Sequence, residues 1–106
     1  MLKFDDKGLI PVIIQDADNG EVLMLGYADK EALQRTLDSG EVWFYSRSRQ
    51  ELWHKGATSG SILKVHSMAK DCDSDAILIR AKPAGPVCHT GNRSCFFQKF
   101  ENEDMG

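Results

Sequence analysis

The sequence contains no apolar run that approaches the ~18 residues of a membrane-spanning helix. Its first residues, Met-Leu-Lys-Phe-Asp-Asp, lack the apolar segment of a signal peptide. Basic residues are not in excess, because 13 lysines and arginines stand against 16 acidic residues, for a net charge of -3. These absences argue against a membrane partner and a general nucleic-acid partner, and they predict a cytoplasmic protein.

Cysteine is also scarce, with three residues in the whole chain. An odd number of cysteines without a secretion signal favours reduced thiols or metal ligation over a disulfide framework. With 106 residues, 42% of them hydrophobic and 27% charged, the composition is typical of one soluble globular domain. We therefore expect a single domain over residues 1–106, with residues 101–106 as a frayed polar tail.

The N-terminal third predicts a β-hairpin followed by a helix. Residues 9–15 and 21–27 are apolar, and the turn sequence Asp18-Asn19-Gly20 lies between them. Asp29 is a candidate N-cap for the only convincing helix, and Gly40 is a candidate end.

Ala32, Leu33 and Leu37 recur at helical spacing and are expected to share one face of that helix. Further strands are predicted at residues 42–45, 62–68 and 76–82, and an aromatic last strand at residues 95–100. The expected fold is mainly β with one principal α-helix, arranged as a curled sheet or pseudobarrel.

The segment Asp-Cys-Asp-Ser-Asp precedes the strand at residues 76–82. If it begins that strand, Asp71, Asp73 and Asp75 lie on one face and Cys72 on the other. Three carboxylates on one face repel one another, which favours a hard cation such as Mg²⁺ or Ca²⁺ between them. The alternative interpretation is a solvated acidic turn.

Cys72, Cys88 and Cys95 are the three candidate ligands for a softer metal. The proline-rich residues 83–86 must break the strand, and we expect the chain to turn there and bring Cys88 towards Cys72. Three thiolates would leave one position of a tetrahedral zinc open for water, which is a catalytic arrangement. The alternative is that these cysteines are small core residues. His89 is a candidate ligand, a candidate acid or base, or a loop residue.

Two segments carry candidate anion-binding groups. Arg47 and Arg49, spaced two apart, either hold a phosphate or solvate a sheet edge. In the segment that follows Trp53, two glycines bracket a hydroxyl pair, so that backbone and side chains can surround an anion. Its candidate groups are Lys55, Thr58, Ser59 and Gly60. The alternative is a tight loop anchored by a buried Trp53.

Together these segments resemble the phosphoribosyl-AMP cyclohydrolase family, enzymes of histidine biosynthesis that open the adenine ring of their substrate. The resemblance covers residues 9–100 and rests on three blocks in the same order. These are Ser46-Arg47-Ser48-Arg49 through Thr58-Ser59-Gly60, then Asp71-Cys72-Asp73 with Asp75, and finally Cys88-His89-Thr90-Gly91 with Ser94-Cys95-Phe96. Ala57 departs from the family, which commonly has glutamate there, and His54 stands where arginine is frequent.

The resemblance implies zinc ligation by Cys72, Cys88 and Cys95, and magnesium ligation by Asp71, Asp73 and Asp75. It implies an intertwined homodimer in which Cys72 of one chain meets Cys88 and Cys95 of the other. The implied reaction is hydrolysis of the N1–C6 bond of N1-(5-phosphoribosyl)-AMP, with His89 as the candidate proton shuttle. Candidate contacts to the two phosphates of this nucleotide are Arg47, Arg49, Lys55, Thr58, Ser59, Gly60 and Arg93. We expect no fused pyrophosphohydrolase domain, which some relatives carry, within these 106 residues.

Three other hypotheses compete with this one. A nucleobase deaminase also uses zinc and thiolates, but its His-x-Glu and Pro-Cys-x-x-Cys signatures are absent. A zinc-stapled binding module without catalytic activity would need a fourth protein ligand, for which His89 is the candidate. A redox protein is disfavoured because Cys88 and Cys95 lack Cys-x-x-Cys spacing.

Overall fold

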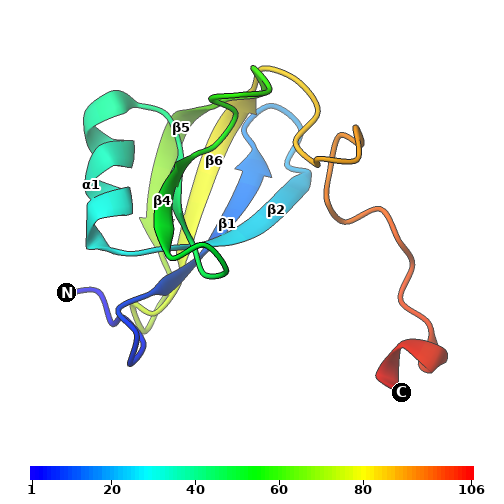
Figure 1. Cartoon of the computed structure of the whole chain (residues 1–106), viewed down its shortest axis with the longest axis horizontal. Helices are drawn as coiled ribbons and strands as arrows, with labels where there is room; N and C mark the ends of the chain where they lie inside the picture. The colour runs from blue at the N-terminus through cyan, green and yellow to red at the C-terminus, as the bar shows by residue number, and fades with distance from the viewer.

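Four strands form one mixed sheet, which contains parallel and antiparallel pairs, in the order β2-β1-β6-β5. Two more strands form a hairpin beside it (Figure 1). The computed structural model describes residues 1–106. Its elements in chain order are β1 (Ile10–Asp16), β2 (Val22–Ala28), α1 (Lys30–Ser39), β3 (Trp43–Ser46), β4 (Glu51–His54), β5 (Leu63–Lys70), β6 (Ile77–Pro83) and the 3-10 helix η1 (Asn102–Met105). Strands hold 36% of the residues and helices 13%, which confirms the mainly β prediction with one principal helix. The sheets do not close into a barrel.

The predicted hairpin is confirmed as the antiparallel pair β1 and β2, which runs from Ile10 opposite Ala28 to Gln15 opposite Val22. β1 also pairs in parallel with β6, with Val12 opposite Ile77. A parallel pair needs a long crossover connection. Here the crossover contains β2, α1, the β3–β4 hairpin and β5, and its loop after β4 carries one wall of the site described below.

Helix α1 begins and ends where the sequence predicts. The Asp29 carboxylate accepts a hydrogen bond from the backbone N–H of Ala32 at 2.8 Å, which satisfies one free donor of the first turn. Gly40 takes a left-handed conformation with φ of 74° and donates its N–H to the Thr36 carbonyl. No helix of the structure is long and apolar enough to cross a membrane.

The buried face of α1 differs from the predicted one by one position. Ala32 and Leu33 are buried as expected, but Leu37 is 64% exposed. Thr36 is buried in its place, and its hydroxyl accepts a hydrogen bond from the Trp43 N–H at 3.0 Å. This contact joins the helix to β3, so a polar residue occupies the position one helical turn after Ala32.

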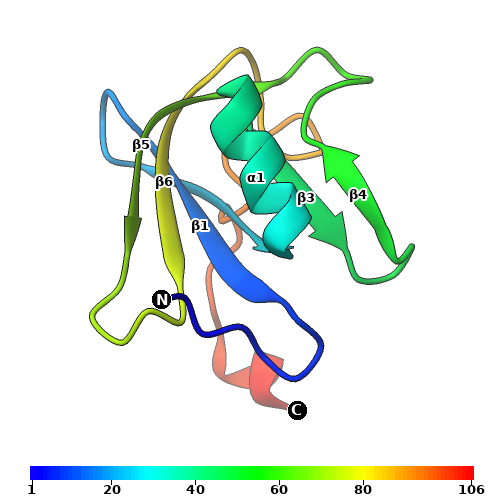
Figure 2. The same cartoon turned by 90° about the vertical axis from the view of Figure 1, so that its left-hand side faces the viewer.

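The hydrophobic core lies between the sheet and the layer formed by α1 and β3 (Figure 2). Alternate residues of the two central strands face it, as the two-residue period of a strand requires. β1 contributes Ile10, Val12 and Ile14, and β6 contributes Ile77, Ile79 and Ala81. The core is therefore built on the two central strands, and β6 links the turn that carries Asp71, Cys72, Asp73 and Asp75 to the segment that carries Cys88.

Residues 71–75 form a turn between β5 and β6, and the prediction that they begin a strand is wrong. The Asp71 carboxylate accepts the backbone N–H groups of Asp75 at 2.9 Å and Ala76 at 3.2 Å. Ser74 has a φ of 62°. A short acidic side chain that bonds to nearby N–H groups stabilises a turn rather than an extended strand.

The predicted aromatic strand at residues 95–100 is also absent. Phe96, Phe97 and Phe100 are 63%, 47% and 69% exposed, and this segment leads away from the sheet to η1 (Figure 1). No strand of the same chain pairs with it. Residues 102–105 form a 3-10 helix with every residue exposed, where the sequence predicted a frayed tail.

Asp16 joins the β1–β2 turn to the C-terminal loop. It is 4% exposed, and its carboxylate accepts the N–H groups of Asp18 at 2.8 Å and Asn19 at 3.3 Å. The guanidinium of Arg93 pairs with both Asp16 and Glu21. The N–H of Asp18, then that of Asn19 and the charge of Arg93, hold the pKa of Asp16 below its usual value of 3.8, although burial opposes them.

We expect Asp16→Asn to lower the free energy of unfolding by about 1–2 kcal/mol at neutral pH, because a charged acceptor is lost. A folded-state pKa below the unfolded value stabilises the fold above the unfolded pKa, and this contribution disappears as the pH falls through the folded pKa. The difference between variant and wild type should therefore shrink below about pH 4 in urea denaturation. Asp6→Asn, at an exposed position, is the matched control. A difference that stays constant with pH would contradict the assignment.

Candidate active site and metal-binding groups

A cavity of about 640 Å³ lies between the turn that follows β4 and the segment around residues 86–91. It brings together residues that lie more than 25 positions apart in the sequence. Six of the predicted site residues line it: Arg49, Lys55, Thr58, Ser59, Cys88 and His89. The cavity thus combines basic and hydroxyl groups on one wall with a thiol and an imidazole on the other.

The wall that follows β4 depends on a glycine. Gly56 has a φ of 85°, and a Cβ there would lie 2.3 Å from the Ser61 carbonyl carbon and from the Ile62 nitrogen. Gly60 donates its N–H to the Gly56 carbonyl at 2.8 Å, which closes the turn. The exposed Thr58 and Ser59 lie at its tip.

Trp53 does not anchor this loop from the core, so the alternative interpretation of a loop anchored by a buried Trp53 is wrong. It is 41% exposed, with its ring tilted against Phe44 at a centroid distance of 5.6 Å. The buried residue is instead Lys55, which is 8% exposed and whose Nζ donates to the Val87 carbonyl at 2.7 Å. This bond connects the two walls of the cavity.

Cys88 and Cys95 lie beside each other. The hydroxyl of Thr90 donates to the Cys88 sulfur at 3.1 Å, and the Cys95 N–H donates to the Leu23 carbonyl of β2 at 2.8 Å. Hydrogen bonds from Thr90 and then Cys95, and last the charge of Lys55, lower the pKa of Cys88, although burial opposes them. Desolvation and then the neighbouring Cys88 raise the pKa of Cys95. The pKa values of the two thiols are thus shifted in opposite directions, and a nearby cation would favour the thiolate form of both, which suits a thiolate-binding metal such as zinc.

Cys72 lies apart from this pair, in the β5–β6 turn. The seven residues of β6 separate that turn from residues 83–86, which is roughly 20 Å of strand. The prediction that the chain turns back and brings Cys88 towards Cys72 is therefore wrong within one chain. A site that uses Cys72 together with Cys88 and Cys95 requires two chains.

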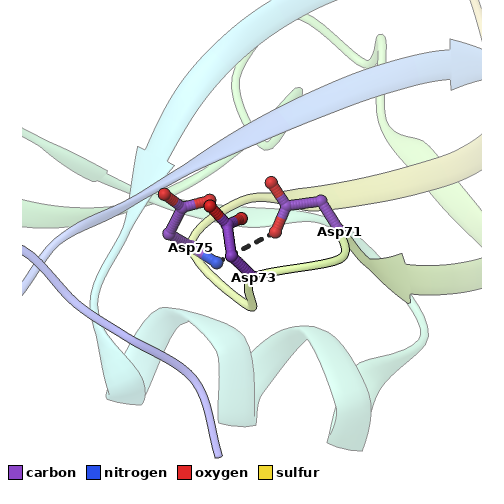
Figure 3. A group of neighbouring side chains, drawn as sticks. All are labelled: Asp71, Asp73 and Asp75. Carbon is purple, nitrogen blue, oxygen red and sulfur yellow. Dashed lines mark hydrogen bonds between the residues drawn. The ribbon is translucent and has the colours of Figure 1, made fainter.

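The β5–β6 turn also holds the acidic cluster (Figure 3). Carboxylate oxygens of Asp71, Asp73 and Asp75 lie within 4.8 Å of one another, and all three residues are exposed. Hydrogen bonds with Asp73 and then Asp71 raise the pKa of Asp75 to about 6. Mutual repulsion thus opposes full ionisation, and oxygen ligands in this number fit a hard cation such as Mg²⁺.

The remaining predicted basic residues are spread around the cavity. Arg47 and Arg49 lie in the β3–β4 turn, not on a strand face. Arg47 stacks over the Tyr27 ring at 4.0 Å, and Arg49 lies 3.8 Å from Glu51 at the cavity wall. Arg93 lies outside the cavity and is held by its two carboxylate partners, and Gly60 is also outside the lining.

The sequence analysis missed two residues that contribute to the candidate site. Thr90 acts on Cys88 from two positions along the chain, a spacing typical of side-chain hydrogen bonds in turns, so the pattern could have been found. Val87 contributes its backbone carbonyl, which binds Lys55. A backbone acceptor has no signal in the sequence.

The chain matches a family model described as phosphoribosyl-AMP cyclohydrolase over residues 24–97. It is 55% identical over 97 residues to the phosphoribosyl-AMP cyclohydrolase of Listeria monocytogenes, covering 92% of each protein. The chain belongs to the phosphoribosyl-AMP cyclohydrolase family. This confirms the resemblance on which the sequence prediction rests.

Other relatives in this family are longer. The histidine biosynthesis bifunctional protein HisIE of Halalkalibacterium halodurans is 56% identical over 97 residues, which are 92% of this chain and 46% of the relative. The protein of the same description from Bacillus subtilis is 53% identical over 102 residues, which are 96% and 49% of the two chains. The chain thus spans about half the length of these bifunctional relatives.

Two glycines in the loop after β4 allow a matched test of its geometry. Gly56 and Gly60 both have positive φ, but a Cβ meets backbone atoms only at Gly56. We expect Gly60→Ala to lower the free energy of unfolding by about 1 kcal/mol through left-handed strain alone. Gly56→Ala should lower it by about 3 kcal/mol, because overpacking adds to that strain. Chemical denaturation measures both, and equal losses would show that the clash at Gly56 is relieved by movement of the loop.

Proposed function

We propose that this protein hydrolyses the N1–C6 bond of N1-(5-phosphoribosyl)-AMP, a step of histidine biosynthesis. The observation that carries the proposal is the cavity of a cyclohydrolase-family chain in which Cys88 and His89 face Lys55, Thr58 and Ser59. In the reaction water adds to C6, the N1–C6 bond breaks, and N1 takes up a proton. The product is the ring-opened phosphoribosyl-formimino-aminoimidazole carboxamide ribotide.

The residues of the cavity divide this work between binding and proton transfer. Arg49, Thr58 and Ser59 are exposed at its wall and are available to the phosphates of the substrate. His89 is exposed beside Cys88, where a neutral imidazole can accept a proton from the attacking water and return it to N1. Arg47, Gly60 and Arg93 lie outside the lining, so they are weaker candidates for direct phosphate contact.

Zinc fits the pair Cys88 and Cys95, with Cys72 of a second chain as the third ligand. When bound, it would supply Lewis acidity towards the attacking water. Two observations support a shared site: β6 separates Cys72 from the pair, and three phenylalanines of residues 96–100 are exposed. Exposed aromatic side chains in such number are typical of an interface, so we infer a homodimer.

Magnesium fits Asp71, Asp73 and Asp75, since a divalent cation would remove the repulsion that raises the pKa of Asp75. Asp71 and Asp73 flank Cys72 in the chain. If Cys72 joins the thiol pair of a partner, these carboxylates necessarily lie close to the partner's cavity. Magnesium would then orient the substrate at the same composite site.

The direct test is ultraviolet absorbance of N1-(5-phosphoribosyl)-AMP mixed with zinc-loaded protein and magnesium, because ring opening changes the chromophore. We expect turnover that disappears when a chelator removes zinc and returns when zinc is restored. Cys88→Ser, which lacks one thiol of the pair, should stay inactive after zinc is added. Folded, zinc-replete protein without turnover would contradict the proposal and favour the zinc-stapled binding module.

A mixing experiment tests the shared site. Cys72→Ser and Cys88→Ser should each be inactive alone, since every site lacks one ligand. In a hybrid dimer both substitutions fall on one site and leave the other intact. After the two variants are unfolded together and refolded, random pairing should restore about a quarter of wild-type activity.

Cys88→Ser mixed with Cys95→Ser is the matched control for this experiment. Both of these residues belong to the same side of the site, so no hybrid contains an intact set of ligands. Activity should therefore stay absent. Failure of the Cys72→Ser and Cys88→Ser mixture to regain activity, with hybrid dimers demonstrated by mass spectrometry, would exclude zinc ligands from both chains.

A further inference from the structure

Lys55 is unlike the other basic groups of the cavity. It is 8% exposed, whereas the Arg49 side chain is 74% exposed. Lysine is almost never buried unless its charge is paired. Yet none of the ion pairs of the structure involves Lys55. The burial of this ammonium therefore needs another explanation than a carboxylate partner.

The surroundings of Lys55 point towards the thiol pair. Its Nζ donates to the carbonyl of Val87, the residue directly before Cys88, at 2.7 Å. Its stem passes Trp53, with Nζ 5.5 Å from the ring centroid. The charge of Lys55 favours the thiolate form of both Cys88 and Cys95. One hydrogen bond leaves two N–H donors of the ammonium free.

We propose that Lys55 is a positioning residue of the zinc site: its ammonium fixes the backbone at Val87 and balances the negative charge of Cys88 and Cys95 when they hold the ion. This rests on the zinc ligation proposed above. It replaces the sequence-based assignment of Lys55 to a substrate phosphate, because the ammonium is buried and its hydrogen bond goes to the backbone carbonyl next to Cys88. The exposed Arg49, Thr58 and Ser59 remain for that purpose.

The charges explain why such a residue is needed. Three thiolates around one Zn²⁺ leave a net charge of about -1 at a partly desolvated site, which is unfavourable without a nearby cation. A lysine in contact with the backbone beside one ligand supplies that cation without occupying a coordination position. Groups that orient or charge-balance metal ligands typically contribute 10–100-fold to affinity, roughly the size of a measurable effect here.

The experiment compares zinc affinity with substrate affinity in the full chain. Lys55→Met keeps most of the apolar stem and removes the charge and the donor, Lys55→Arg keeps both, and Lys82→Met at an exposed position of β6 is the matched control. Zinc dissociation constants are measured by competition with a chromophoric chelator. KM and kcat are measured at saturating zinc.

We expect Lys55→Met to weaken zinc binding by about tenfold or more, with KM within about twofold of wild type at saturating zinc. Lys55→Arg should recover most of the zinc affinity, and Lys82→Met should leave both quantities unchanged. Wild-type zinc affinity in Lys55→Met, combined with a KM raised about tenfold, would overturn the proposal and restore the phosphate assignment.

Two further outcomes are decisive. If Lys55→Met does not fold, Lys55→Gln, which keeps a hydrogen-bond donor but not the charge, takes its place: weakened zinc binding with near-normal KM at saturating zinc supports the proposal, whereas normal zinc affinity with a raised KM overturns it. Because zinc binding is measured without substrate, the result is independent of the proposed reaction. A wild-type protein that binds zinc but opens no purine ring would refute the function and still test the role of Lys55.

Discussion

The position of the thiol pair depends on contacts that come from outside its own segment. Residues 87–95 form neither helix nor strand, and three backbone hydrogen bonds close the segment on itself: Val87 to Arg93, Cys88 to Asn92 and Gly91 to Cys88. Several contacts with the core fold hold it in place, and three of them act at different parts of the segment. Arg93 pairs with Asp16 at the end of β1, Cys95 bonds to β2, and Lys55 bonds to Val87 from the loop after β4. The loop that carries the candidate catalytic residues is thus positioned by a rigid scaffold, as functional loops usually are.

The three points of attachment differ in how they respond to conditions. The Asp16 contact is between charged groups at the edge of the fold, so acid weakens it. The Cys95 bond is part of the backbone and changes little with pH. The Lys55 bond is buried and charged, so loss of its partner would leave an unpaired charge inside the protein. Of the three contacts, the Lys55 bond is therefore the one whose loss we expect to cost most. It lies next to Cys88, where the chemistry is proposed to occur.

Elements with local signals could be predicted from the sequence. The turn at Asp18-Asn19-Gly20 and the caps Asp29 and Gly40 act within a few residues, so their patterns defined the hairpin and the helix. The wrong predictions of local structure arise where hydrophobic or alternating patterns compete with side-chain hydrogen bonds. Residues 71–75 read as a strand by alternation, but Asp71 forms a turn by bonding to its own neighbours. Thr36 replaced Leu37 on the buried face because its hydroxyl bonds to β3, a contact that hydrophobic periodicity ignores.

The sequence predicted which residues belong to the candidate site better than it predicted how they are arranged. Six of its residues do share one cavity, because motifs record which side chains are present. The burial of Lys55 was not predicted, since a sequence does not show which polar side chain of a loop points into the fold. The aromatic residues 96–100 were assigned to the core for a related reason. Apolar character indicates that a surface will be covered, but not whether the covering surface belongs to the same chain.

Whether a surface is covered by the same chain or by a second one also matters for the proposed zinc site. β6 runs from the turn that carries Cys72 and the three aspartates towards the segment that carries Cys88, so its length keeps the two halves of the zinc site apart. A single chain can offer zinc two thiolates, which is one fewer than an open catalytic site requires. Sharing the site between chains would make metal binding and assembly mutually dependent, since each supplies what the other lacks. The exposed phenylalanines next to Cys95 would then form part of the dimer interface. They would place apolar contact area beside the thiol pair, to which the second chain would add Cys72.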